Sequence, residues 1–189
     1  MKNKTTLMHF FASVIATVWL CACAGSQKPK QEKQEYEDNS APVTVKDEAN
    51  HYMGMAGMAL SEGNEQEALA NYLAAAEIYD RSGSIVEERA EAHFLAADIA
   101  YQLSERVQAI EEYEKSVDIY LRFSGNSKIK AANALNNMGT IYKELLKKSR
   151  AIDCWTRALE IYREAPKELQ NEANMQKIQQ NIRDVEQGF

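Results

Sequence analysis

The chain has 189 residues, of which 45% are hydrophobic and 26% are charged, a balance typical of a folded protein and not of a disordered one. Its net charge is −6, and Lys2 and Lys4 are the only charged residues in positions 1–22, so the remainder carries −8. Nucleic-acid binding depends on a basic surface. This acidic balance therefore argues against nucleic acid as a partner.

The first 22 residues have the pattern of an export signal. Lys2 and Lys4 precede an apolar run from Leu7 to Leu20, and about fourteen apolar residues are too few for a membrane span. The end of the run, Leu20-Cys21-Ala22-Cys23-Ala24, can be read in two ways. Ala22-Cys23-Ala24 fits an ordinary signal-peptidase site, whereas Leu20 to Cys23 resembles a bacterial lipobox. The second interpretation is favoured.

The lipobox resemblance implies that Cys23 becomes the diacylated N-terminus of an envelope lipoprotein. Several acyl chains on one residue would anchor it durably, because each buried methylene contributes about 0.8 kcal/mol. Ala24 follows the cysteine where aspartate could stand, which resembles the outer-membrane destination of enteric-type bacteria and implies a periplasm-facing protein. Residues 23–46 are then expected to be a flexible tether, since they have almost no aliphatic side chain to bury.

Beyond the tether, apolar residues at helical spacing predict helices and no strand. The expected helix ranges are about 47–60, 64–81, 84–103, 105–123, 128–146, 150–165 and 168–186. Asn64 with Glu67, and Ser84 with Glu87, fit capping boxes at the starts of the second and third helices. Pro166 ends the sixth helix. The buried face of the last helix is expected to contain Leu169, Ala173, Ile178, Ile182 and Val185.

Three copies of one pattern divide the helical region. The copies are ALANYLAAAEIY at 68–79, AIEEYEKSVDIY at 109–120 and AIDCWTRALEIY at 151–162, and each ends in an Ile-Tyr pair. Their leading alanines, Ala68, Ala109 and Ala151, are 41 and 42 residues apart. Self-similarity at a fixed period of this size indicates a solenoid of stacked helix pairs.

These helix pairs resemble the tetratricopeptide repeat family. The third copy carries the motif's large, small and aromatic residues at Leu135, Met138, Gly139 and Tyr142, then at Ala151, Trp155 and Ala158. The resemblance implies an all-α, right-handed solenoid over residues 47–166. Its three repeats would span 49–82, 90–123 and 132–165, and a capping helix would follow at 168–187. The period exceeds the family's usual 34 residues, which implies longer second helices.

In this family the first helix of each pair lines a concave groove that binds an extended peptide or a partner helix. The matching positions here are Met53, Gly57, Leu60, Phe94, Asp98, Tyr101, Gln102, Asn133, Asn136, Thr140 and Lys143. The asparagines can bond a peptide backbone, and Phe94 and Tyr101 can anchor apolar side chains. The basic residues with which some members hold a C-terminal carboxylate are absent from the matching positions. A chaperone-tail receptor is therefore not expected.

No motif points to catalysis, to a cofactor or to a metal ion. His51 and His93 lack partners at the spacing of a catalytic triad, and no Cys/His cluster has zinc-ligand spacing. His93 fits a helix-packing position, and Glu111-Glu112 is expected to be a solvated part of a helix surface.

The favoured function is therefore a non-enzymatic, membrane-anchored module that scaffolds or recruits an envelope protein through the groove. Trp155 and Cys154, the most conspicuous residues of the third copy, are expected in the core. The alternative is an enzyme or ligand-binding envelope lipoprotein that uses an unrecognised pocket.

Overall fold

The computed structural model describes residues 44–188, so the predicted signal segment, Cys23 and nearly all of the predicted tether lie outside the described residues. Within 44–188 the chain is all helical, as predicted. The elements are α1 Val45–Ser61, α2 Glu65–Ser82, α3 Glu87–Gln102, α4 Arg106–Tyr120, α5 Asn126–Glu144, α6 Lys148–Glu164, a 3₁₀ turn at Lys167–Leu169 and α7 Glu172–Gln187. None of these helices is both long and apolar enough to cross a membrane.

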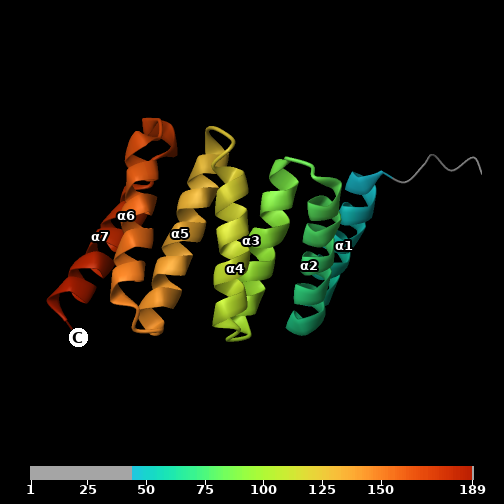
Figure 1. The fold of residues 1–189 in the computed structure, drawn as a ribbon, viewed down its shortest axis with the longest axis horizontal. Helices are drawn as coiled ribbons and strands as arrows, with labels where there is room; N and C mark the ends of the chain where they lie inside the picture. The colour runs from blue at the N-terminus through green and yellow to red at the C-terminus, as the bar shows by residue number, and fades with distance from the viewer. Residues whose placement is uncertain (1–43, 189) are drawn as a thin grey trace, which may run out of the picture. The chain divides into compact units, whose positions relative to one another are not determined.

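The helices form three hairpins, α1–α2, α3–α4 and α5–α6, that lie side by side in chain order (Figure 1). Successive hairpins pack through α2 against α3 and through α4 against α5, and α7 covers α6 at the C-terminal end. Each hairpin thus packs both within itself and against the hairpins next to it in the chain, which is how a solenoid is stabilised. The predicted architecture of three helix pairs and a cap is confirmed.

The helix starts agree with the sequence at one predicted cap and differ at the other. Asn64 Oδ1 accepts from the Glu67 amide at 3.3 Å and its Nδ2 donates to Glu67 Oε2 at 2.7 Å, so α2 has the predicted cap. The prediction that Ser84 caps α3 is wrong. Helix α3 begins after Val86 without a side-chain cap, and the Ser84 hydroxyl instead accepts a hydrogen bond from the hydroxyl of Ser82 at 2.8 Å.

The last helix begins later than predicted. A separate 3₁₀ turn occupies Lys167–Leu169, and the side chain of Asn171 caps α7 by accepting from the Asn174 amide at 3.0 Å. Ala173, which was predicted on the buried face, is exposed in the first turn of α7. The buried residues of this helix are Met175, Ile178 and Val185.

Small residues mark the closest helix contacts. Ala68, Ala109 and Ala151, which define the sequence period, are each 0% exposed, and so is Trp155. Trp155 lies against Gly139 on α5 so closely that a Cβ atom at Gly139 would be 2.4 Å from Trp155 Nε1. The same nitrogen donates a hydrogen bond to a backbone carbonyl of α5 at 3.2 Å. Glycine at residue 139 therefore lets Trp155 pack against α5 without displacement of either helix.

A buried polar network joins the first two hairpins and corrects one prediction. Glu112 is 5% exposed and not solvated. Its carboxylate lies 2.6 Å from His93 Nδ1 and accepts from Lys115 Nζ at 2.7 Å, and His93 Nε2 lies 3.3 Å from Asp80 Oδ1 on α2. Glu112 is three residues after Ala109, so both lie on the side of α4 that faces α3. Burial opposes ionisation of Glu112, but the hydrogen bonds from His93 and Lys115 hold its pKa below the ordinary value.

Replacing Gly139 by alanine should destabilise the fold, because the added methyl group overlaps a fully buried, rigid indole. We expect the free energy of unfolding to fall by about 1–3 kcal/mol. Gly57→Ala in α1 is the matched control, since a Cβ there meets nothing within 4 Å. It should raise the free energy of unfolding by about 0.5–1 kcal/mol through helix propensity. Denaturant titrations measure both, and shifts of the same sign would contradict this packing.

Glu111 and Glu112 offer a second matched pair. Glu112→Gln should lower the free energy of unfolding by about 1–3 kcal/mol at pH 7, because it weakens a buried, charge-assisted network. Glu111→Gln, which is exposed, should change it by less than about 0.5 kcal/mol. The pKa of Glu112 is lowered in the folded state. Its contribution is therefore complete above the unfolded pKa of about 4.3 and is lost as the pH falls through the folded value.

Thermal melts at pH 7 and pH 3 check this expectation. The difference in melting temperature between Glu112→Gln and the wild type should be smaller at pH 3 than at pH 7. Equal effects of the two substitutions at pH 7 would show that Glu112 is solvated after all.

Candidate functional site

The first helices of the hairpins, α1, α3 and α5, contact one another directly through side chains. Lys46 on α1 donates to Glu88 on α3 at 2.5 Å, and Tyr101 on α3 donates to Glu144 on α5 at 2.5 Å. Successive first helices are therefore linked without the second helices between them. We call the positions on α1, α3 and α5 that match the family's groove the first-helix face.

The two aromatic residues of this face also serve the packing between helices. Phe94 is half-buried and stands edge-to-face against Tyr113 of α4, with ring centroids 5.6 Å apart. Tyr101 is half-buried and bonds Glu144, which also accepts from Arg106 at 2.9 Å. The hydrogen bond to Glu144, together with burial, raises the pKa of Tyr101. Truncating either ring would therefore change stability as well as the surface.

Asp98 lies in the middle of the face and is held by two neighbours. Its carboxylate accepts from the Tyr113 hydroxyl and from Asn137 Nδ2 at 3.4 Å, and Asn137 also donates to Tyr113 at 3.0 Å. Burial raises the pKa of Asp98, and these two hydrogen bonds offset only part of that effect. The sequence interpretation missed Asn137. Its signal is the adjacent pair Asn136-Asn137 in mid-helix, where asparagine has poor helix propensity.

The third repeat presents one buried polar group without a partner. Asn133 accepts from the Tyr162 hydroxyl, and Thr140 donates to the backbone carbonyl of Asn136 at 3.2 Å. The side-chain oxygen of Asn136 is buried, and no donor within residues 44–188 reaches it. Such an unsatisfied acceptor costs about 1–3 kcal/mol and is uncommon in folded proteins. Lys143 lies half-buried one helical turn beyond Thr140.

The remaining predicted residues lie from the middle of α1 to its C-terminal end and at the C-terminal end of α3. Met53 is partly buried and packs against the core. Gly57 and Leu60 are exposed on α1, with Leu60 36% exposed, and Gln102 is exposed as the last residue of α3. The face therefore has half-buried groups at its centre and accessible side chains at its ends. Within the described part of the chain, no cluster of His, Cys, Asp and Glu could hold a metal ion.

Comparison with known proteins agrees with this geometry. Residues 88–164 match the tetratricopeptide repeat family. No curated protein matches the chain. Among solved structures, BtubC (BKLC) from P. vanneervenii is similar with a TM-score of 0.66 and 20% identity, over 76% of this chain and 57% of that one. The chain thus spans little more than half of that relative's length.

Two further solved structures are similar over almost their whole length. The N-terminal domain of stress-induced protein-1 (STI-1) from C. elegans has a TM-score of 0.56 and 17% identity, over 73% of this chain and 97% of that one. The first TPR of Spaghetti (RPAP3), bound to the HSP90 peptide SRMEEVD, has a TM-score of 0.52 and 16% identity, over 75% of this chain and 98% of that one. At these identities the likeness concerns the fold alone. The described helical region has the fold of a tetratricopeptide-repeat solenoid, and residues 88–164 match that family.

Proposed function

We propose that the protein is an interaction module that recruits or scaffolds a partner protein through its first-helix face. The match to tetratricopeptide repeats over 88–164 supports this proposal. A solved structure of similar fold, the first TPR of Spaghetti (RPAP3), is described as bound to an HSP90 peptide. In such a module the solenoid supplies a rigid surface, and binding rather than chemistry is the activity.

The observation that carries the proposal is the composition of the first-helix face, where the half-buried polar side chains of Asp98 and Asn136 accompany the half-buried rings of Phe94 and Tyr101. The side-chain oxygen of Asn136 is covered by the chain itself, so a partner would contact the remaining, half-buried part of this residue. Direct contacts between α1 and α3, and between α3 and α5, keep the surrounding surface in one geometry. A binding surface that is already ordered loses less conformational entropy when its partner binds.

The accessible ends of the face suit a partner with both apolar and polar side chains. Leu60 presents an apolar side chain at 36% exposure, and Gln102 presents an amide. Phe94 and Tyr101 add the edges of half-buried rings between these ends. The natural occupant is therefore an extended peptide or a helix of a partner protein.

The double variant Asn136→Ala and Leu60→Ala should weaken partner capture at least tenfold, because it removes one half-buried polar side chain and one exposed apolar side chain from the face. Crosslinking pull-down of the full chain from its native envelope measures capture. Thermal melts must show that the variant stays folded. The variant is preferred to Phe94→Ala and Tyr101→Ala, whose rings also pack between helices.

Glu111→Ala on the exposed part of α4 is the control and should leave capture unchanged. If this control abolished capture while the double variant did not, the partner would bind elsewhere on the protein and the first-helix proposal would be wrong.

We further propose that a lipid on Cys23 holds the module at the bacterial envelope, at the periplasmic side of the outer membrane. The support is the lipobox-like Leu20-Cys21-Ala22-Cys23 after an apolar run. Mass spectrometry of the mature N-terminus should find an acylated Cys23, and Cys23→Ser should release the protein from membranes. An unmodified chain that begins at Gly25 would instead indicate simple secretion.

A further inference from the structure

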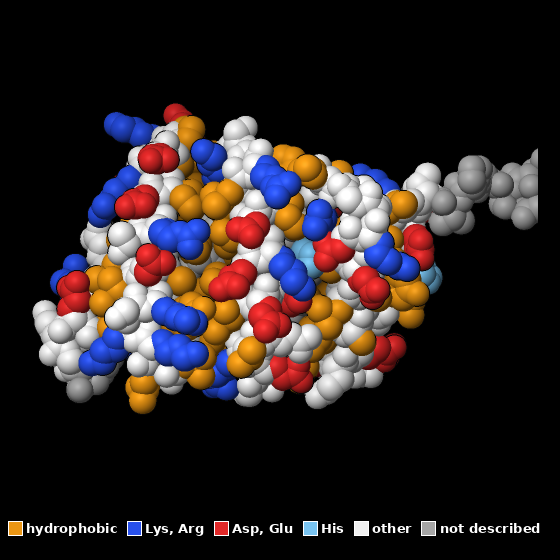
Figure 2. Space-filling view, viewed as in Figure 1, with side chains coloured by type: hydrophobic (Ala, Val, Ile, Leu, Met, Phe, Trp, Pro, Cys, Tyr) orange, Lys and Arg blue, Asp and Glu red, His pale blue; other side chains and the backbone are white. Residues whose placement is uncertain are grey.

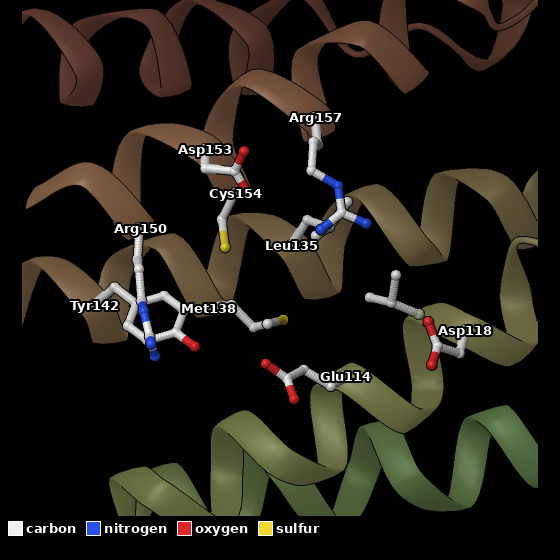
Figure 3. A pocket seen from close by; sticks show the side chains of 10 residues that line it. Glu114, Asp118, Leu135, Met138, Tyr142, Arg150, Asp153, Cys154 and Arg157 are labelled. Carbon is white, nitrogen blue, oxygen red and sulfur yellow. The ribbon is translucent and has the colours of Figure 1, made fainter. Parts of the chain in front are cut away.

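A cavity of about 450 Å³ lies between α4, α5 and α6, away from the first-helix face. Its α5 residues, Leu135, Met138 and Tyr142, occupy a different side of that helix from Asn133, Asn136 and Thr140. Figure 3 shows side chains converging on it from the three helices. Pockets of this volume accommodate small ligands. The cavity is therefore a candidate for a second site with its own occupant.

The two sides of the cavity have opposite charge. Helix α4 contributes Glu114 and Asp118, one helical turn apart. Helix α6 contributes Arg150 and Arg157, with Asp153 between them, so this side keeps a net positive charge. Over the surface seen in Figure 2, acidic and basic side chains interleave around orange apolar patches. In the close view of Figure 3, Glu114 and Asp118 lie on the opposite side of the cavity from Arg150 and Arg157, so an acidic wall faces a basic wall.

The charged groups of these walls are not neutralised by one another. None of the ion pairs formed within residues 44–188 involves Glu114, Asp118, Arg150 or Arg157. Arg150 lies over the ring of Tyr142, with its guanidinium carbon 5.5 Å from the ring centroid. Arg150 also forms a hydrogen bond with the Tyr142 side chain, and its guanidinium has further N–H donors for a ligand. Both walls can therefore still pair with charges of a ligand.

The floor between the walls is apolar and contains sulfur. Val117, Leu135, Met138 and Cys154 line it, and all four are buried. Burial raises the pKa of the Cys154 thiol to about 11, so the thiol is neutral near pH 7 and the floor carries no charge. In Figure 3 the sulfur atoms of Cys154 and Met138 both lie toward the cavity. Such a floor favours an aliphatic side chain.

We propose that this cavity binds a short zwitterionic peptide. Its carboxylate end would pair with Arg150 and Arg157, its amino end with Glu114 and Asp118, and its central aliphatic side chain would cover the apolar floor. The proposal joins two opposed, unpaired charges to an uncharged floor, a combination that neither a simple anion nor a simple cation would use fully. It goes beyond the proposed partner recruitment, because it involves other helices and a small ligand.

The test uses the full chain and the tripeptide Lys-Leu-Glu, which concentrates positive charge at one end and negative charge at the other. Isothermal titration calorimetry at low salt should show saturable one-to-one binding. Acetylated and amidated Gln-Leu-Gln, which has the same length but no charge, should bind at least tenfold more weakly. Lys-Gly-Glu should also bind more weakly, because it lacks the side chain for the floor. Raising the salt concentration should weaken binding, since partly exposed charge pairs are screened.

Matched variants locate the site. Arg150→Gln and Glu114→Gln, one from each wall, should each weaken Lys-Leu-Glu binding at least fivefold. Arg163→Gln, exposed on α6 outside the cavity, and Glu111→Gln, exposed on α4, should change it less than twofold. Asn136→Ala should also leave it unchanged, which separates this site from the first-helix face. Melts of each variant establish that the fold is intact.

The outcomes decide the proposal. Saturable binding that both wall variants weaken and the controls preserve supports it. Absence of saturable binding, equal binding of the uncharged peptide, or binding that survives both wall variants would overturn it. None of these results depends on whether a partner protein is captured through the first-helix face.

Discussion

The close approach of helices at small residues is the constraint on which the rest of this structure depends. Ala68, Ala109 and Ala151 are fully buried where the hairpins close. At Gly139 the approach is so tight that Trp155 occupies the space of a Cβ atom. Helices packed this closely also fix the directions in which their remaining side chains point. The regular geometry of the first-helix face and the cavity between α4, α5 and α6 both follow from these contacts.

Tyrosine hydroxyls from the second helices tie this packing to polar groups on the first helices. Tyr120 donates to Glu91 and Tyr162 donates to Asn133, at equivalent places in the second and third repeats. The equivalent hydroxyl of the first repeat, on Tyr79, is buried without a partner within residues 44–188. The hydroxyl of the closing tyrosine is therefore satisfied in the second and third repeats and not in the first. Polar residues that the sequence suggested for binding, such as Asn133, also hold the hairpins together.

Helix α5 contributes to both proposed sites because its two sides have different compositions. One side presents Asn133, Asn136 and Thr140 to the first-helix face, and the other presents Leu135, Met138 and Tyr142 to the cavity. A macromolecular partner on one side and a small peptide on the other would thus contact the same rigid element. Because each side uses different side chains, variants can test the two sites separately.

The sequence by itself determined the helix pairs, their register and the buried alanines, since these follow from periodicities that each segment carries locally. It did not determine which polar groups would meet. Glu112 was expected in solvent and lies beside His93, and Asn137 was overlooked and bonds Asp98. Both contacts join residues from different helices, so they depend on how neighbouring helices pack. Only the tertiary structure could decide these pairings, because the distance between two side chains is a property of packing and not of either segment alone.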